Sequence, residues 1–280
     1  MHYTTLIPVA ELARRLDDAQ WVVCDCRHAL GDVELGRRAD REAHIPGARF
    51  LHLDDDLSGP RTGHNGRHPL PDPRALAIRL GECGIGNDMQ VVAYDASGGC
   101  YAARLWWMLR WLGHTHAAVL DGGWQAWMEN GHPATVDLPA VRPARFVARV
   151  QEHLAVDARF VLQHLDGAEV CVLDARSADR FRGENEVLDP VGGHIPGAVN
   201  RFFRDNIDAA GRFKPPEVLQ GELQHVLGAR APAQVIHQCG SGVTACHNLL
   251  AMEHAGLSGS RLYPGSWSEW VSDPSRPVAR

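Results

Sequence analysis

The 280-residue sequence has no apolar run of the length needed to cross a bilayer, so we do not expect an integral membrane protein. It has no basic start followed by an apolar core and a small-residue cleavage site, and we therefore expect no signal peptide. Positive charge is not in excess, because 28 Lys and Arg stand against 34 Asp and Glu. This balance gives no reason to expect nucleic acid or a membrane as a partner.

Cysteine is present without a disulfide pattern. An odd, scattered set in a chain of this size indicates reduced thiols, and we expect a cytoplasmic protein. The seven cysteines are Cys24, Cys26, Cys83, Cys100, Cys171, Cys239 and Cys246.

Four segments of the first half return in the same order in the second half. WVVCDCR (21–27) returns as VCVLDAR (170–176), AHIPGARF (43–50) as GHIPGAVN (193–200), VVAYDASGGCYAAR (91–104) as VIHQCGSGVTACHN (235–248), and LDGGWQAW (120–127) as YPGSWSEW (263–270). The pattern predicts a tandem duplication of a domain of roughly 130 residues, with a few more loop residues in the first copy. We expect domains at 1–135 and 151–280, joined by a Pro-rich linker at 136–150.

Each copy alternates short apolar runs with apolar segments of helical length. The runs WVVCD, VVAYD and AAVLDG end in Asp or Gly and are typical of buried parallel strands. Segments such as YAARLWWMLRWLG are closed by Gly at a C-terminal cap position. The sequence therefore predicts an α/β fold, with two domains that each form a mainly parallel sheet flanked by helices.

The duplication separates structural from functional candidates, because features kept in both copies serve the shared fold. Aligning the copies puts Asp95 opposite Cys239, so the first copy has the loop but not the thiol. Cys24, Cys26, Cys171 and Cys246 are expected in the core. The features interpreted as structural are the pairs Asp25/Arg27 and Asp174/Arg176, His44 and His194 of HIPGA, and Trp124, Trp127, Trp267 and Trp270.

The loop after Cys239 has the residues of an anion nest. Gly240 and Gly242 let the backbone curl so that successive N–H groups point inward, and the following helix adds its positive N-terminal end. Such a loop would stabilise a thiolate or the anionic outer sulfur of a persulfide without a cation in the loop itself. We predict that Cys239 is a nucleophile.

HIPGA in both halves, CGSGVTAC in the second and YPGSWSEW near the end together resemble the tandem rhodanese family. The Cys239 loop is most similar to that of 3-mercaptopyruvate sulfurtransferases, and the resemblance covers nearly the whole chain. It implies two rhodanese-like domains, the first catalytically inactive. It also implies transfer of a sulfane sulfur from 3-mercaptopyruvate or thiosulfate through a Cys239 persulfide. The implied partners are a small-molecule donor and an acceptor such as thioredoxin, a low-molecular-weight thiol or cyanide, with no metal or organic cofactor.

The resemblance also suggests which residues bind the donor. Arg180 matches the arginine that grips the substrate carboxylate, and Arg182 is a second candidate. Many of these enzymes have a further arginine where this chain has Asp189, an anion that would disfavour a carboxylate, and Arg201 or Arg204 are candidates to compensate. The loop residues expected at the substrate are Gly240, Gly242, Val243 and Thr244.

A proton-moving set of serine, histidine and aspartate is implied as well. Ser241 matches the serine, His68 the histidine and Asp54 the aspartate, which would let a carboxylate orient a histidine that polarises a hydroxyl. His64 competes with His68 for this role. Asp54 alternatively belongs to a solvated acidic loop.

Other functions make different demands on the sequence. A phosphatase of related fold needs an arginine six positions after its cysteine, where this chain has Ala245. A non-catalytic sulfur carrier or interaction scaffold, and a thiosulfate-preferring enzyme, remain alternatives. Metal binding by His64, His68 and nearby aspartates fits the composition but has no recognised ligand spacing.

Overall fold

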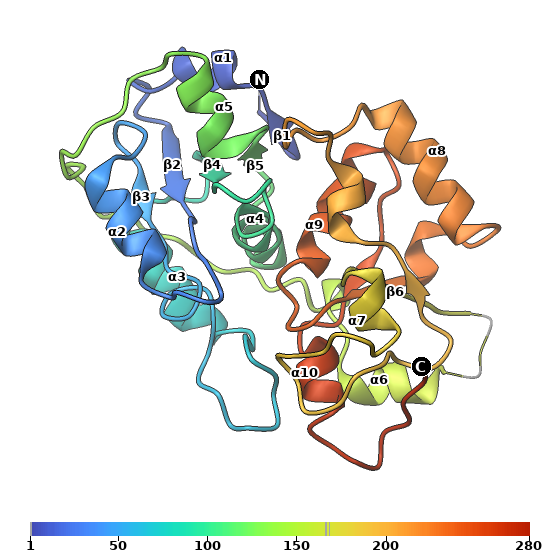
Figure 1. Cartoon of the computed structure of the whole chain (residues 1–280). Helices are drawn as coiled ribbons and strands as arrows, with labels where there is room; N and C mark the ends of the chain where they lie inside the picture. Colours follow the sequence, from blue (N-terminus) through green and yellow to red (C-terminus); the bar gives the residue numbers. More distant parts are fainter. Residues whose placement is uncertain (1, 166, 168) are drawn as a thin grey trace. The chain divides into compact units, whose positions relative to one another are not determined.

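The computed structural model describes residues 2–165, 167 and 169–280. The chain divides into two compact units. Unit 1 comprises Met1–Gly59, Pro71–Gln151 and Ala209–Phe213, and unit 2 comprises Pro60–Leu70, Glu152–Asp208 and Lys214–Arg280. The segment Pro60–Leu70, the cyan loop in Figure 1, therefore belongs to the compact unit that the second half of the chain forms.

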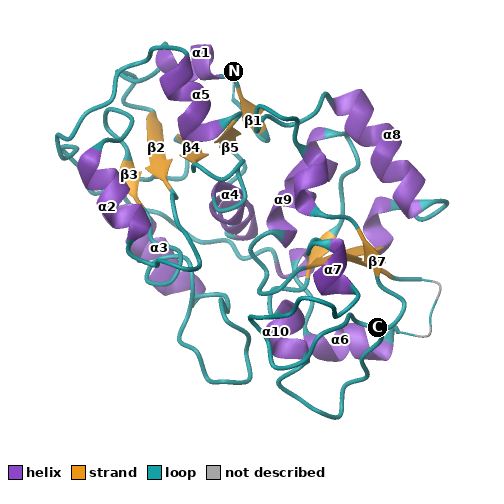
Figure 2. Cartoon of the chain, in the orientation of Figure 1, coloured by secondary structure: helices purple, strands orange, loops and turns teal. Residues whose placement is uncertain are grey.

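Unit 1 contains a five-stranded sheet in the order β1-β5-β4-β2-β3, and every pairing is parallel. Parallel neighbours need crossover connections, and the helices that make them flank the strands (Figure 2). The elements in chain order are β1 Leu6–Ile7, α1 Val9–Ala13, β2 Trp21–Asp25, α2 Leu35–Glu42, β3 Arg49–Phe50, α3 Pro73–Glu82, β4 Gln90–Tyr94, α4 Ala102–Trp111, β5 Ala117–Leu120 and α5 Gly123–Glu129.

Unit 2 repeats this plan with four parallel strands in the order β7-β6-β8-β9. A parallel bridge between Ala155 and Leu262 stands where β1 pairs with β5 in unit 1. The elements are η1 Glu152–Leu154, α6 Ala158–Gln163, β6 Cys171–Asp174, α7 Ala178–Phe181, β7 Val199–Asn200, η2 Phe203–Asn206, α8 Pro216–Leu227, η3 Pro232–Gln234, β8 Val235–Gln238, α9 Ala245–His254, β9 Arg261–Leu262 and α10 Ser266–Trp270. The predicted α/β fold with two duplicated parallel sheets is confirmed.

The features predicted to be structural are structural in both units. Arg27 binds the Asp25 carboxylate and the Ala43 carbonyl, and Arg176 binds Asp174 and the Gly193 carbonyl in the same way. His44 and His194 each place Nδ1 on a backbone carbonyl, of Asp40 and Phe181 respectively. These repeated contacts tie the HIPGA turns to the ends of β2 and β6.

The predicted tryptophans lie in the two cores. Trp127, Trp267 and Trp270 are fully buried, and Trp124 packs against the core of unit 1. Arg27 stacks over Trp124 at 4.5 Å and Arg176 over Trp267 at 4.6 Å. None of the helices within the described residues combines the length and the apolar character needed to cross a membrane.

Candidate active site around Cys239

Cys239 lies directly after β8, at the carboxyl edge of the parallel sheet of unit 2. Its side chain is buried, and the Gly242 amide donates a hydrogen bond to Sγ at 3.2 Å. Gly242 has φ of +78°, and a Cβ there would lie 2.2 Å from the Pro264 carbonyl oxygen, so only glycine fits. The predicted inward-curling loop is therefore present.

Helix α10 holds the outer side of the loop through its first amides. The Trp267 amide donates to the Cys239 carbonyl at 3.0 Å, and the Ser268 amide to the Gly240 carbonyl at 2.9 Å. These two bonds fix the carbonyls of Cys239 and Gly240 to the start of α10.

Ser266 is a site residue that the sequence reasoning missed. It accepts a hydrogen bond from the Cys239 amide at 3.1 Å and donates one to the Tyr263 carbonyl at 2.9 Å. Its φ is +54°, a left-handed conformation that costs a non-glycine residue roughly 1–2 kcal/mol. In the first copy the same place holds Gly123, with φ of +56°. The difference between serine and glycine in the aligned copies was the signal that could have found it.

In the equivalent loop of unit 1, the inward-pointing backbone amides bind a carboxylate. Buried Asp95 accepts four backbone hydrogen bonds, at 2.7–2.9 Å, and each of its two oxygens takes two. The donors are the amides of Ser97, Gly99, Tyr101 and Ala102. The duplicated loop is thus built to satisfy an anion at the position that Cys239 occupies in unit 2.

His68 belongs to unit 2 and is buried, and its Nδ1 shares a hydrogen bond with the Ser241 hydroxyl at 2.7 Å. His64 is exposed, and its carbonyl accepts a hydrogen bond from Ser272 at 3.4 Å. The geometry therefore selects His68 over His64 as the histidine beside Ser241.

Two guanidinium groups lie over Gly240, the residue that follows Cys239. An ideal Cβ on Gly240 would lie 2.8 Å from Nη2 of Arg67 and 3.6 Å from Nη2 of Arg180. Arg67 forms an ion pair with Asp189, and Arg180 binds Glu186 through Nε and Nη2 at 2.8–3.0 Å. The loop carries no cation of its own, but the fold brings two to it.

The other arginines singled out from the sequence have different partners. Arg182 is half-exposed and binds Glu184 at 2.7 and 2.8 Å. Arg201 binds Glu222 at 2.6 Å, and the guanidinium of Arg204 lies 5.9 Å from the ring centre of Phe203. The second guanidinium at Gly240 is therefore that of Arg67, which the sequence reasoning did not consider.

Asp54 lies in unit 1, beside two buried histidines. One ligand-type atom each of His28, His52 and Asp54 falls within 4.8 Å of the others. However, Nδ1 of His52 accepts the amides of Asp54 and Asp55 at 3.2 Å, and Nε2 lies 2.9 Å from the Val33 carbonyl. Because both ring nitrogens of His52 already have hydrogen-bond partners, the group fits a hydrogen-bonded turn better than a metal site.

The other cysteines predicted to be core are buried, and Cys246 donates to the Gly242 carbonyl at 3.3 Å. Burial raises the pKa of Cys24, Cys26, Cys83 and Cys171. A raised pKa keeps these thiols protonated and unreactive at neutral pH.

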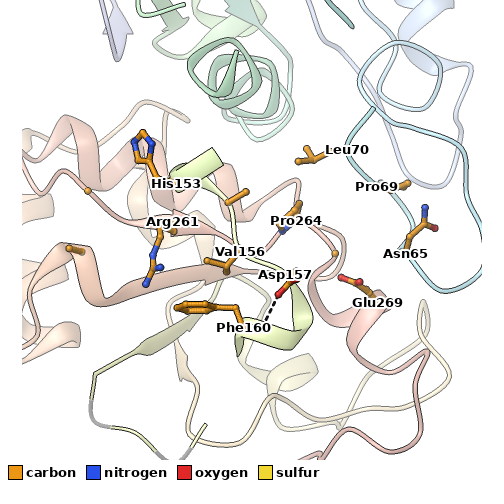
Figure 3. Close-up of a pocket in the computed structure, with 14 residues that line it drawn as sticks. Asn65, Pro69, Leu70, His153, Val156, Asp157, Phe160, Arg261, Pro264 and Glu269 are labelled. Carbon is orange, nitrogen blue, oxygen red and sulfur yellow. Dashed lines mark hydrogen bonds between the residues drawn. The ribbon is translucent and has the colours of Figure 1, made fainter. Parts of the chain in front are cut away.

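A cavity of about 840 Å³ lies beside the loop of unit 2 (Figure 3). Pro264 and Gly265 line it, and Pro264 also packs against Gly242 of the Cys239 loop. Arg261 stacks over Phe160 at 4.7 Å, and Asp157 caps α6 by accepting the Phe160 amide. Cys239 is not among the residues that line this cavity.

Comparison with known proteins identifies relatives along the whole chain. A family model described as "Rhodanese-like domain" matches twice, over residues 8–130 and 157–273. The "Probable 3-mercaptopyruvate sulfurtransferase" of Pseudomonas aeruginosa is 47% identical over 281 residues, which is 100% of this chain and 99% of that protein. Thiosulfate sulfurtransferase of Mus musculus is 35% identical over 263 residues, covering 91% of this chain and 84% of the mouse protein.

Solved structures give the same result. The crystal structure of SseA from Escherichia coli, described among 3-mercaptopyruvate sulfotransferases with the "Rhodanese" fold, matches with a TM-score of 0.84. The sequence identity is 29%, and the match covers 95% of this chain and 99% of that one.

Proposed function

This chain belongs to the rhodanese-like family of sulfurtransferases, and from that membership we propose that Cys239 carries a sulfane sulfur from 3-mercaptopyruvate to a thiol acceptor. The observation that carries the proposal is the arrangement around one sulfur. An amide donates to Sγ of Cys239, a hydroxyl–histidine pair stands two residues on, and two guanidinium groups lie over Gly240. A donor that is both a keto acid and a thiol needs stabilisation of the anionic sulfur, a path for the thiol proton and a cation for its carboxylate.

The first half-reaction forms the persulfide. The Cys239 thiolate attacks the donor sulfur, the carbon–sulfur bond breaks, and its electron pair goes to the carbon of the pyruvate enolate. The donor thiol proton ends on that carbon to give pyruvate. Ser241 and His68 provide the path for this proton, and the guanidinium of Arg180 binds the donor carboxylate.

The second half-reaction restores the enzyme. An acceptor thiol, such as that of thioredoxin or a small thiol, attacks the outer sulfur and leaves Cys239 as thiolate. Cyanide can take the same sulfur. The loop amides hold the negative charge on sulfur in both resting and persulfide forms.

The proposal extends to the remaining parts of the chain. Residues 1–135 form a copy without a nucleophile, 136–150 form the linker, and 151–280 carry Cys239, with the segment Pro60–Leu70 serving the second copy. Asp54 would orient His68, and Arg182, Val243 and Thr244 would lie along the substrate path. The protein would work in the cytoplasm, where thiol acceptors are reduced.

Thiosulfate is the second candidate donor, because relatives at 34–37% identity are named thiosulfate sulfurtransferases. The test is intact mass after incubation with either donor and no acceptor, with Cys239→Ser as control. A gain of one sulfur in the wild type alone supports the persulfide, and the faster donor identifies the preference. No gain from either donor would refute the proposed chemistry and favour a non-catalytic carrier or scaffold.

A further inference from the structure

The cavity of about 840 Å³ in unit 2 has no role in the chemistry described so far (Figure 3). All of its lining residues belong to unit 2. Its volume lies within the range of sites that hold small organic ligands. Much of the wall is apolar, and it includes Leu70, Val156, Phe160 and Pro264. The cavity can therefore enclose the apolar body of a small ligand.

A cation without a counter-ion lines this cavity. Within residues 2–165, 167 and 169–280, Arg261 takes part in no ion pair, and its buried Nε has no hydrogen-bond partner. Its guanidinium carbon lies 4.7 Å from the ring centre of Phe160. Burial lowers the pKa of Arg261, as expected for a cation that is taken out of water with no acid beside it. A ligand anion would supply both the missing charge and the missing hydrogen-bond acceptor.

An acid lies across the cavity from Arg261 (Figure 3). In the part of the chain that the structure describes, Glu269 takes part in no ion pair either, and its carboxylate lies against Gly265. Burial raises the pKa of Glu269, and the charge of Asp157, another lining residue, raises it further. This end of the cavity is therefore acidic and lacks a cation, which a ligand ammonium would supply.

The two charged residues have no counterpart in the other copy. Arg261 has the place in β9 that Ala118 has in β5, because both pair with the same position of the neighbouring strand in the repeat. The repeated segments 120–127 and 263–270 put Ala126 opposite Glu269. Ala118 and Ala126 are 1% and 2% exposed and belong to the core of unit 1. Since alanine serves the shared fold at both places, the charges of unit 2 are candidates for a function of their own.

We propose that this cavity is a binding site for a short peptide with free ends. Arg261 binds the peptide carboxylate, Glu269 binds its ammonium group, and Phe160 and Val156 contact the apolar middle. A simple anion or a simple amine would leave one of the two partly buried charges without a partner. A single α-amino acid carries both of its charges on one carbon, so it does not match charges that lie on opposite sides of the cavity.

The test is titration calorimetry of the full chain with alanyl-phenylalanyl-alanine, its N-acetylated form and its C-amidated form. Arg261→Met should weaken binding of the free tripeptide about tenfold or more, the effect of one lost charge-assisted contact, and should leave binding of the C-amidated form unchanged. Glu269→Gln should weaken the free tripeptide similarly and leave the N-acetylated form unchanged. Arg159→Met and Glu217→Gln are matched controls, because both residues are exposed and neither lines the cavity.

Hydrogen exchange locates the bound peptide. Amides of the segment 261–269 should exchange more slowly in the complex, while those of 216–227 in α8 should not change. Arg261→Met should melt no lower than the wild type, because it removes a partly buried charge that has no counter-ion.

Three results would overturn the proposal. They are no binding of the free tripeptide at millimolar concentration, equal weakening of the free and capped peptides by each variant, and binding of acetate as tight as that of the tripeptide. Because the tripeptide has no sulfur to transfer, none of these measurements depends on whether Cys239 forms a persulfide.

Discussion

The imidazole Nδ1 of His68 lies 2.7 Å from the hydroxyl oxygen of Ser241, although 173 positions separate the two residues in the chain. This contact places a group that can accept a proton beside the hydroxyl of Ser241, two residues after Cys239, the proposed nucleophile. It matters only for a donor that carries a proton on its sulfur, and thiosulfate has none to move.

Replacing Ser241 by alanine should therefore separate the two donors. We expect persulfide formation from 3-mercaptopyruvate to slow about 100-fold, within the usual range for a lost acid–base group. The rate with thiosulfate should change far less. Stopped-flow or quenched-flow mass measurements of the Cys239 persulfide give both rates, and an equal loss for both donors would contradict the proton-transfer role.

The two loop glycines should respond differently to alanine. Gly240 is not among the positive-φ glycines, and its new Cβ would meet only the ends of the Arg67 and Arg180 side chains, so Gly240→Ala should fold normally. It should raise the KM for the donor several-fold by displacing these guanidinium groups. Gly242→Ala meets the Pro264 carbonyl at a φ of +78° and should lose more than about 2 kcal/mol of unfolding free energy. Thermal melting and steady-state kinetics on both variants check this contrast.

Ser266 adopts a strained left-handed backbone conformation, and in that conformation its hydroxyl accepts a hydrogen bond from the Cys239 amide. Ser266→Gly relieves roughly 1–2 kcal/mol of left-handed strain and loses two hydrogen bonds worth about 1 kcal/mol each, so stability should change by no more than about 1 kcal/mol. Persulfide formation should slow about tenfold, because the Cys239 amide loses its acceptor. Ser266→Ala keeps the strain and loses both hydrogen bonds, so it should be the less stable of the two in urea titrations. Equal stability of the two variants would count against this account.

Asp95 should be a major source of stability in unit 1. Asp95→Asn turns one of two acceptor oxygens into a donor that faces two backbone N–H groups. Leaving them unsatisfied costs about 1–3 kcal/mol each, so we expect a loss of at least about 2 kcal/mol. Exposed Asp88→Asn is the matched control. A melting temperature equal to that of the control would show that the nest does not need the carboxylate.

Acid should destabilise unit 2 through His237. Burial lowers the pKa of His237 to about 3, whereas an unfolded histidine titrates near 6.5. The unfolded state therefore binds the extra proton first, and the contribution of His237 to stability, complete above pH 6.5, is lost as the pH falls toward 3. The slope is about 1.4 kcal/mol per pH unit.

Urea unfolding between pH 4.5 and 7 should show this slope reduced in His237→Gln. His114 and His116, whose pKa values burial also lowers, are present in both proteins and cancel in the comparison. Parallel stability curves for the variant and the wild type would contradict the assignment to His237.

The sequence was sufficient for whatever depends on local pattern. Apolar runs ending in Asp or Gly predicted the strands, and the repeat predicted two sheets of one plan. Cys239 stood out because its aligned partner is Asp95. The same alignment contained Ser266 opposite Gly123, but recognising it required knowing that the position has positive φ.

Arg67 could not be found in this way, because its meaning depends on distant partners. Asp189 is 122 positions away, and the space beside Gly240 exists only once the loop has folded. Asp189 seemed unfavourable to a carboxylate donor for the same reason, since its counter-ion is not a sequence neighbour. The only local indication of such a segment was that the first copy has a few more loop residues than the second.

The segment Pro60–Leu70 is encoded in the first half of the duplicated chain but belongs to the compact unit of the second half. A gene copy encoding only residues 136–280 would still translate the nucleophile and its loop, but not the histidine beside Ser241 or the arginine beside Gly240. Duplication usually frees one copy to be lost. Here the first half of the chain, which has Asp95 in place of Cys239, contributes the segment Pro60–Leu70 to the compact unit of the second half.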